Sequence, residues 1–446
     1  MPSIQIESAR IHVKDHLTNA HILIVDGVIK RISKLRPTQE ADFKIDGRKL
    51  IALPGLIDAH VHLRDLELSY KETFETGTQA AAAGGFTTVL DMPNTRPPTI
   101  SGQRLKEKMS AAKGRLFANV GFQGTLVHDV NEIDLMKRAG AISFKLYMNK
   151  ALETFDSSDK SSLQEALQFA GQSDVLVTVH AEEGDSIHRV QQEFMAKGRT
   201  TVRDFLKAHD PEFEEEAVQR IVKLRRGALP RIHFCHITMP AAVKTIMGIP
   251  NATCEATAHH LLLNQSVFRK MKTLAMCVPP VRNESIRRKL WQLFARGHVD
   301  ILASDHAPHT LAEKTKANAW ETATGVPGLE TSLPMLFTQV TKGRLTLRRL
   351  IDATATLPSK IFHLKGKGEL REGYDADIVL VDPKDRFRVK PESFLSKAKF
   401  SPFRDMKCVG RAAYTIVNGA LVAERGRIVG PPVGSIIRGD QVSASY

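Results

Sequence analysis

Hydrophobic and polar positions alternate in short runs at both ends of the chain, and turn dipeptides separate these runs. Near the N-terminus, Asp26-Gly27 interrupts the apolar segment 20–32, and near the C-terminus, Asn418-Gly419 interrupts the segment 414–430. Asp-Gly and Asn-Gly pairs between such runs are typical of β-hairpins. We therefore predict antiparallel sheet at both ends, and we expect the two ends to meet in one small β-sandwich domain.

The middle of the chain has a different pattern of hydrophobic positions. From about residue 54 to residue 363, helical stretches such as 161–172 and 214–227 alternate with apolar runs of strand length, which occupy residues 87–92, 141–148, 174–180, 231–236 and 299–305. Strand–helix alternation over roughly 300 residues predicts a parallel α/β fold, and this length suits a (β/α)8 barrel of the TIM type. The barrel is favoured over an open dinucleotide-binding sheet because the sequence has no GxGxxG fingerprint.

These patterns divide the 446 residues into three parts: 1–53 and 366–446 form the two portions of the β-domain, and 54–365 form the barrel. With 42% hydrophobic and 25% charged residues, the composition is that of an ordinary globular protein. No run approaches the roughly 18 apolar residues of a membrane helix, and the N-terminus carries charges where a signal peptide would be apolar. We expect a soluble, cytoplasmic protein without membrane association, whose four cysteines are reduced core thiols.

The chain is basic, with 63 Lys and Arg against 49 Asp and Glu and a formal net charge of +14. The basic residues occur in short, scattered clusters, without a sustained tract or a nucleic-acid-binding motif. We therefore predict that the chain binds no nucleic acid. An acidic small-molecule substrate is compatible with this charge.

The first candidate residues for chemistry lie in the segment LPGLIDAHVHLRD at 53–65. His60, His62 and Arg64 occur at every second position, which places their side chains on one face of an extended strand. Two neighbouring imidazoles can chelate one metal ion. In a chain with 17 histidines, this pair alone could also be two ordinary polar residues.

Three further metal-competent residues end apolar runs: His180, His236 and Asp305. The carboxyl ends of the strands of a (β/α)8 barrel lie at one face, and active sites are built there. Each residue could be an ordinary polar side chain at the edge of the core. Together with His60 and His62, however, they predict a metal site.

Lys145 lies inside the apolar run 141–148, where a bare ammonium group is costly to bury. One solution is an ion pair with a carboxylate. Another is reaction of the neutral amine with carbon dioxide, because the resulting carbamate could bridge two divalent cations. Both solutions are compatible with the residues alone.

Several motifs resemble those of the cyclic amidohydrolases and, within them, the type I dihydroorotases. The resemblance extends from about residue 52 to residue 330, and its motifs are HVHLRD at 60–65, MPNT at 92–95, FKLYM at 144–148, HAE at 180–182, CEATAHHLLL at 254–263 and SDHAPHTLAEK at 304–314. The DHAPH sequence is the most specific of them. The resemblance implies a metal-dependent hydrolase barrel of the TIM type with a composite β-domain.

The resemblance also implies a cofactor, namely two Zn²⁺ ions per subunit bridged by N6-carboxylated Lys145. The more buried zinc would be held by His60, His62, Lys145 and Asp305. The second would be held by carboxylated Lys145 with His180 and His236. Asp305 would in addition be catalytic, as the residue that carries the proton.

Substrate binding is implied for His62, Arg64, Asn94 and His309, together with the backbone around Thr324 and Gly325. These residues would give an acidic ring a cationic pocket, because an arginine presents a planar pair of donors to a carboxylate.

Two departures from the family pattern occur. Val278 stands where an asparagine is common, which removes one expected amide contact, and the loop after Arg64 has a different sequence. We interpret His259 and His260 as structural residues, because the implied zinc ligands are complete without them.

The activity implied is that of a zinc-dependent dihydroorotase, which interconverts (S)-dihydroorotate and N-carbamoyl-L-aspartate in de novo pyrimidine biosynthesis. Another cyclic amidase, such as a dihydropyrimidinase, hydantoinase or allantoinase, is the alternative. An inactive homologue with a structural role is disfavoured because all six implied ligands are present. The sequence is compatible with a homo-oligomer and with contact to an aspartate transcarbamoylase.

Overall fold

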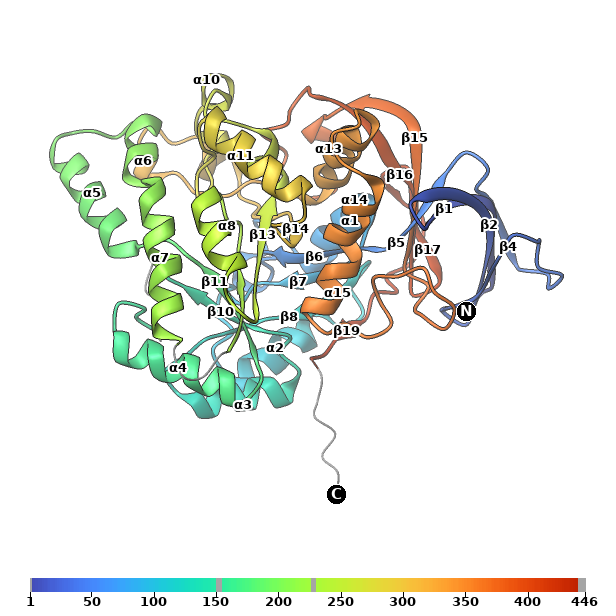
Figure 1. Ribbon diagram of the computed structural model, residues 1–446, viewed down its shortest axis with the longest axis horizontal. Helices are drawn as coiled ribbons and strands as arrows, with labels where there is room; N and C mark the ends of the chain where they lie inside the picture. The colour runs from blue at the N-terminus through green and yellow to red at the C-terminus, as the bar shows by residue number, and fades with distance from the viewer. Residues whose placement is uncertain (1, 150–154, 226–229, 440–446) are drawn as a thin grey trace.

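The computed structural model describes residues 2–149, 155–225 and 230–439, and it contains a barrel joined to a β-domain (Figure 1). The barrel strands follow one another around the barrel in chain order, with parallel pairing. They are β6 (Leu56–Val61), β7 (Phe86–Asp91), β8 (Asn119–Phe122), β10 (Phe144–Tyr147), β11 (Leu176–His180), β12 (Arg231–Phe234), β13 (Ala252–Thr257) and β14 (Ile301–Ala303).

Two short contacts complete the ring. The two-residue strand β9 (Gly124–Thr125) follows β8 and pairs with β10, and a parallel bridge between Val61 and His306 joins the ends of β6 and β14. Helices surround the ring, and the described ones are α1 (Phe74–Ala83), α2 (Gly102–Ala112), α3 (Val130–Ala139), α4 (Lys160–Gln172), α5 (Gly184–Ala196), α6 (Val202–Ala208), α7 (Pro211–Leu224), α8 (Pro240–Met247), α9 (Ala258–Leu262), α10 (Val267–Met271), α11 (Glu284–Ala295), α12 (Leu311–Lys314), α13 (Leu329–Thr341), α14 (Leu347–Ile351) and α15 (Leu357–Ile361). The predicted fold class is confirmed.

Local sequence signals explain where helices begin. Asp159 caps α4 by accepting a hydrogen bond from the Ser161 backbone N–H. Asp210 caps α7 in the same way, and Pro211 occupies the first helical position. The helix predicted at 214–227 therefore starts three residues earlier than its apolar pattern suggests, and the final part of that range lies outside the described residues.

The β-domain is built from both chain ends, as predicted. Its sheet has the order β18-β17-β16-β15-β5-β1-β2-β3, with β4 paired to β1, and β15 pairs antiparallel with β5 where the two ends meet. The strands are β1 (Ile4–Val13), β2 (His16–Val25), β3 (Val28–Ser33), β4 (Phe43–Asp46), β5 (Ile51–Pro54), β15 (Ile378–Arg388), β16 (Lys407–Val417), β17 (Ala420–Glu424) and β18 (Arg427–Ile428).

Both predicted hairpin turns are present. Asp26 and Gly27 have φ of 51° and 79°, and Asn418 and Gly419 have φ of 49° and 80°. Two consecutive positive φ angles define the type I′ turn that Asp-Gly and Asn-Gly favour.

The chain then returns to the barrel. After the β-domain, β19 (Ile436–Ile437) pairs in parallel with β8. The predicted division at residues 53 and 365 does not include this return.

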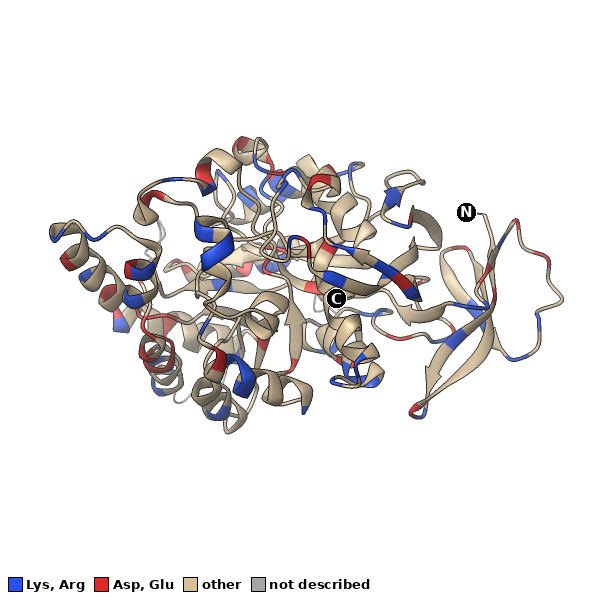
Figure 2. Cartoon of the chain, turned by 90° about the horizontal axis from the view of Figure 1, so that it is seen from above, with Lys and Arg blue, Asp and Glu red and all other residues tan. Residues whose placement is uncertain are grey.

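Charges are mixed over the surface. Figure 2 shows basic and acidic residues interspersed on both the barrel and the β-domain. Among the described residues, no helix has both the length and the apolar character that a membrane crossing requires.

The packing of α13 against β16 depends on Gly410, which has a φ of +89°. A Cβ at Gly410 would lie 2.1 Å from Cδ1 of buried Phe337. We expect Gly410→Ala to lower the free energy of unfolding by about 2 kcal/mol or more, because overpacking adds to backbone strain. Gly426→Ala is the matched control, since Gly426 has a φ of +80° but no atom within 4 Å of the added methyl. Thermal unfolding of both variants measures the difference, and equal losses would contradict the packing argument.

Candidate metal and substrate site

A cavity of about 220 Å³ lies at the carboxyl ends of the barrel strands. It brings together every residue that the sequence analysis proposed for the site: His60, His62, Arg64, Asn94, Lys145, His180, His236, Asp305, His309, Thr324 and Gly325. These residues come from separate strand ends and loops, and only closure of the barrel makes them neighbours.

The first group of possible metal ligands contains His60, His62 and Asp305, whose ligand atoms lie within 4.8 Å of one another. The Nε2 atoms of His60 and His62 lie 3.4 Å and 3.2 Å from Asp305 Oδ1. The other ring nitrogens are held from behind, because His60 Nδ1 lies 2.6 Å from Glu255 Oε1 and His62 Nδ1 lies 2.7 Å from Asn94 Oδ1. This arrangement orients both Nε2 atoms towards Asp305, as metal-ligating histidines require.

Burial, together with the charge of Lys145, lowers the pKa of His60 to about 4. The ring is therefore neutral near pH 7 and keeps a lone pair for a ligand.

The second group consists of His180, at the end of β11, and His236, after β12. Their ring centroids are 4.6 Å apart. Nε2 of His180 lies 2.8 Å from Glu182 Oε2, and the other oxygen of Glu182 lies 3.1 Å from Nδ1 of His209. Burial lowers the pKa of both His180 and His236, so both rings are neutral.

His236 supplies the clearest indication that a cation fits here. Its Nδ1 is buried and has no hydrogen-bond partner among the described residues. An unpaired buried ring nitrogen is costly unless something absent from the chain satisfies it. A divalent cation fits this nitrogen, because neutral imidazole and carboxylate are ligands that Zn²⁺ prefers.

Lys145 is fully buried in β10, with 0% exposure. Its Nζ donates to Cys235 Sγ at 2.9 Å and lies 5.2 Å from the centroid of the Tyr147 ring. Burial raises the pKa of the Cys235 thiol to about 12, so this thiol is no anionic partner. Among the described residues, no carboxylate pairs with Lys145. The geometry thus offers no support for the simple ion pair that the sequence left open.

On the other side of the cavity, Arg64 is only 8% exposed. Its Nε donates to the Pro308 carbonyl at 3.4 Å, and its Nη2 lies 3.3 Å from His309 Nε2. No carboxylate in the described part of the chain pairs with this guanidinium. A buried guanidinium facing a cavity without a counter-charge is suited to a carboxylate of a ligand.

His309 is held between two neighbours, since its Nε2 lies 3.1 Å from the Thr324 carbonyl and its Nδ1 lies 3.2 Å from Lys71 Nζ. Burial and the charges of Arg64 and Lys71 lower the pKa of His309 to about 2. The neutral ring can therefore accept from Lys71 through Nδ1 and donate to Thr324 through Nε2.

Several residues at this site were not indicated by the sequence patterns that predicted the others. Tyr147 and Asn149 line the cavity, and Glu182 and Glu255 orient the histidines. A signal exists for two of them, because Tyr147 and Glu182 lie two positions after Lys145 and His180, where an extended chain returns to the same face. His260 uses both ring nitrogens in contacts with Thr257 and the Pro279 carbonyl, and neither it nor His259 lines the cavity.

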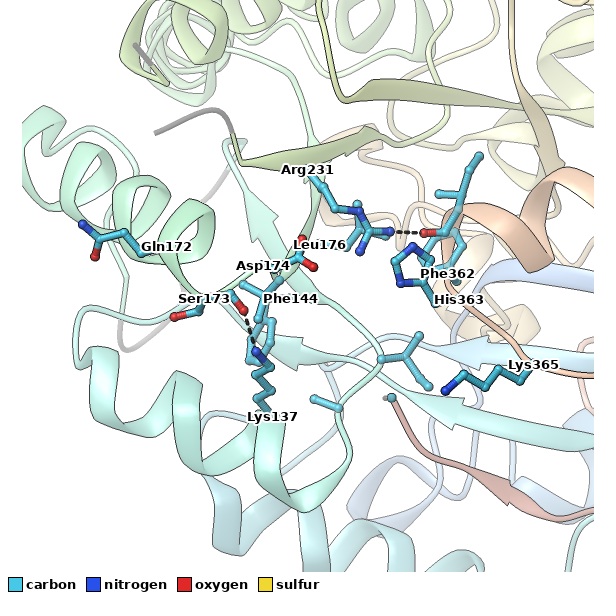
Figure 3. A pocket seen from close by; sticks show the side chains of 15 residues that line it. Lys137, Phe144, Gln172, Ser173, Asp174, Leu176, Arg231, Phe362, His363 and Lys365 are labelled. Carbon is cyan, nitrogen blue, oxygen red and sulfur yellow. Dashed lines mark hydrogen bonds between the residues drawn. The ribbon is translucent and has the colours of Figure 1, made fainter. Parts of the chain in front are cut away.

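A larger hollow of about 640 Å³ lies at the opposite end of the barrel, where β10, β11 and β12 begin (Figure 3). Its basic residues include Lys137 and Arg231, which donate to the backbone carbonyls of Ser173 and Ile361. None of the proposed site residues lies there. The smaller cavity is the candidate active site because it has the ligands and lies at the catalytic end of a barrel.

Comparisons with known proteins show the family to which this fold belongs. The model of the Amidohydrolase family matches residues 51–422. A dihydroorotase of Halobacterium salinarum is 38% identical over 371 residues, covering 83% of this chain and 86% of the relative. An L-hydantoinase of Paenarthrobacter aurescens is 32% identical over 441 residues, covering 96% of each protein. The solved structure of an L-hydantoinase (dihydropyrimidinase) from Arthrobacter aurescens has a TM-score of 0.93 and 32% identity, and covers 98% of this chain and 100% of that one.

Proposed function

Because the chain belongs to the amidohydrolase family and is a cyclic amide hydrolase, we propose that it is a dihydroorotase of de novo pyrimidine biosynthesis. It would interconvert (S)-dihydroorotate and N-carbamoyl-L-aspartate. The observation that carries this proposal is Arg64, a buried guanidinium beside the candidate metal ligands with no carboxylate partner among the described residues. A ring that bears a carboxylate supplies that partner, and an uncharged ring does not.

The substrate side of the cavity holds the ring by its acidic group. Arg64 presents two donors to the carboxylate, and Asn94, whose Oδ1 is already used by His62, can donate through its Nδ2. His309 and the backbone at Thr324 and Gly325 bound the remaining wall. Fixing the carboxylate sets the position of the scissile ring amide relative to Asp305.

The proposed cofactor is a pair of Zn²⁺ ions. His60, His62, carboxylated Lys145 and Asp305 would hold the more buried ion, and Lys145, His180 and His236 the other. When bound, the pair supplies an activated water and polarises the ring carbonyl.

Asp305 is the proposed proton carrier. It follows β14 at the catalytic end of the barrel, and its Oδ1 faces His60 and His62. In ring opening, its carboxylate takes the proton of the attacking water and delivers it to the leaving ring nitrogen. Ring closure uses the same steps in reverse.

The second candidate function is that of a hydantoinase or dihydropyrimidinase. The similarity to L-hydantoinases favours it, since the Paenarthrobacter relative is 32% identical over 96% of the chain and the Arthrobacter structure has a TM-score of 0.93 over 98% of it. Val278 also lines the cavity, at the position where the dihydroorotase pattern often has an asparagine. The buried guanidinium of Arg64 disfavours an uncharged ring, because such a ring supplies no carboxylate to pair with it.

The test compares substrates on protein loaded with zinc. Loss of dihydroorotate is followed by ultraviolet absorbance, beside hydantoin, dihydrouracil and allantoin under the same conditions. We expect the highest kcat/KM with dihydroorotate. A higher kcat/KM with an uncharged ring would replace the proposal by the second candidate.

Arg64→Met tests the carboxylate contact. We expect kcat/KM for dihydroorotate to fall roughly 30-fold or more, because the substrate charge loses its partner. This fall corresponds to a loss of about 2 kcal/mol of transition-state stabilisation. Metal content, measured by elemental analysis, stays at the level of the unmodified protein. The matched control is Arg349→Met: Arg349 is also 8% exposed, but it donates to the Phe294, Val299 and Asp300 carbonyls at the other end of the barrel. Unchanged kinetics in Arg64→Met would contradict the assignment.

A further inference from the structure

A buried ion pair lies beneath the substrate side of the cavity, outside the set of candidate metal ligands. Lys108 on α2 and Asp91 at the end of β7 are each 1% exposed, with Nζ and Oδ2 separated by 2.7 Å. We infer that these two residues are a positioning pair that holds Arg64 and Asn94 in the arrangement that selects an acidic ring. This inference rests on the proposed function.

The carboxylate of Asp91 holds the backbone next to Arg64. Its Oδ1 accepts a hydrogen bond of 2.7 Å from the Leu63 N–H. The next three residues, Arg64, Asp65 and Leu66, have φ of 58°, 49° and 50°. A positive φ is unfavourable for a non-glycine residue, so this segment needs contacts that hold it.

The far side of this segment is held separately. The carboxylate of Asp65 accepts from the Phe74 N–H at 2.7 Å and pairs with Arg115 at 2.9 Å. Asp91 therefore controls the side of the strained segment from which the Arg64 side chain enters the cavity.

The ammonium group of Lys108 holds the backbone next to Asn94, the other proposed substrate-binding residue. Its Nζ donates to the Met92 carbonyl at 2.9 Å, and Met92 precedes Asn94 by two residues. Asn94 in turn contacts His62 through Oδ1. One ion pair thus ties together the two chain segments that carry the proposed carboxylate-binding side chains.

A charged pair at this place is better suited to fixing geometry than to adding stability. Its surroundings are apolar, with the Phe122 ring 5.4 Å from Lys108 Nζ, and a buried ion pair is often no more stabilising than packed hydrophobic residues. The two carboxylate oxygens of Asp91 have different partners. Oδ1 accepts the hydrogen bond from the Leu63 N–H, and Oδ2 pairs with the Lys108 ammonium.

Two variants test the inference. Lys108→Met removes the ammonium. Asp91→Asn keeps the shape of the side chain but replaces one carboxylate oxygen by an NH2 donor, which then faces either the Leu63 N–H or the Lys108 ammonium. For each, we expect kcat/KM for dihydroorotate to fall about tenfold or more, chiefly through KM, because small misplacements of a binding group are costly. The inhibition constant of orotate should rise by a similar factor, and zinc content should stay unchanged.

The matched control is a second buried pair, Lys367 and Asp377, which are 7% and 4% exposed and 2.6 Å apart. Asp377 accepts a hydrogen bond from Asn119, which lies at the start of β8. The cavity lies at the opposite ends of the barrel strands. Lys367→Met should lower the melting temperature without changing KM or orotate inhibition. Lys108→Arg, which keeps a charged donor, should recover part of the affinity.

The outcomes separate the inference from the proposed function. If the unmodified protein fails to hydrolyse dihydroorotate, the proposed function is wrong and the inference falls with it. If the unmodified protein prefers dihydroorotate, but Lys108→Met and Asp91→Asn lower the melting temperature and leave KM and orotate inhibition within about twofold, the pair is only structural. That result would overturn the inference alone.

Discussion

Asp305→Asn is expected to abolish turnover in both the ring-opening and the ring-closing direction, by about a hundredfold or more, because the amide cannot carry the proton. The barrel should still form, since the Asp305 side chain lies in the cavity and not in the barrel core. Steady-state assays in both directions and circular dichroism measure the two effects. Activity above a few per cent of the unmodified protein would contradict the role of proton carrier.

The control for this prediction lies at the other end of the same strand. Asp300 directly precedes β14, and its Oδ2 accepts a hydrogen bond from the Cys254 N–H. Asp300→Asn changes the same chemical group outside the cavity. It should therefore cost some stability while turnover and zinc content remain near those of the unmodified protein.

Lys145→Ala is expected to remove one zinc ion per subunit and most of the turnover, because the proposed carbamate is the bridge between the two ions. The charge balance gives the reason: two Zn²⁺ ions carry four positive charges, and Asp305 with a hydroxide supplies only two negative ones. Elemental analysis measures the lost ion. A small carboxylate that can occupy the bridge should restore part of the activity.

The carbamate itself has a separate test. Apoprotein reconstituted with zinc should gain activity faster when bicarbonate is added. Lys137→Ala is the control, because Lys137 lies in the hollow at the opposite end of the barrel and donates to the Ser173 backbone carbonyl (Figure 3). A high-resolution map of fully active protein with an unmodified Lys145 ammonium pointing away from the metals would defeat the proposal. A single-metal centre with His60, His62 and Asp305 would then replace it.

Local signals determined most of the fold. The type I′ turn at Asp26-Gly27 was predictable because two adjacent residues that tolerate positive φ specify it without help from the rest of the chain. The barrel was predictable because strand and helix periodicities are properties of contiguous residues. Strand polarity then placed His180, His236 and Asp305 at one end of that barrel before any distance between them was known.

Only the tertiary structure determined which residues distant in sequence are in contact. Glu255 orients His60 from 195 residues away, and no local pattern joins those two positions. The same is true of Lys145, whose Nζ donates to the thiol of Cys235, and of β19, which returns to pair with β8. The physical reason is that periodicity specifies the face on which a side chain lies, whereas its neighbours across that face depend on how the whole barrel closes.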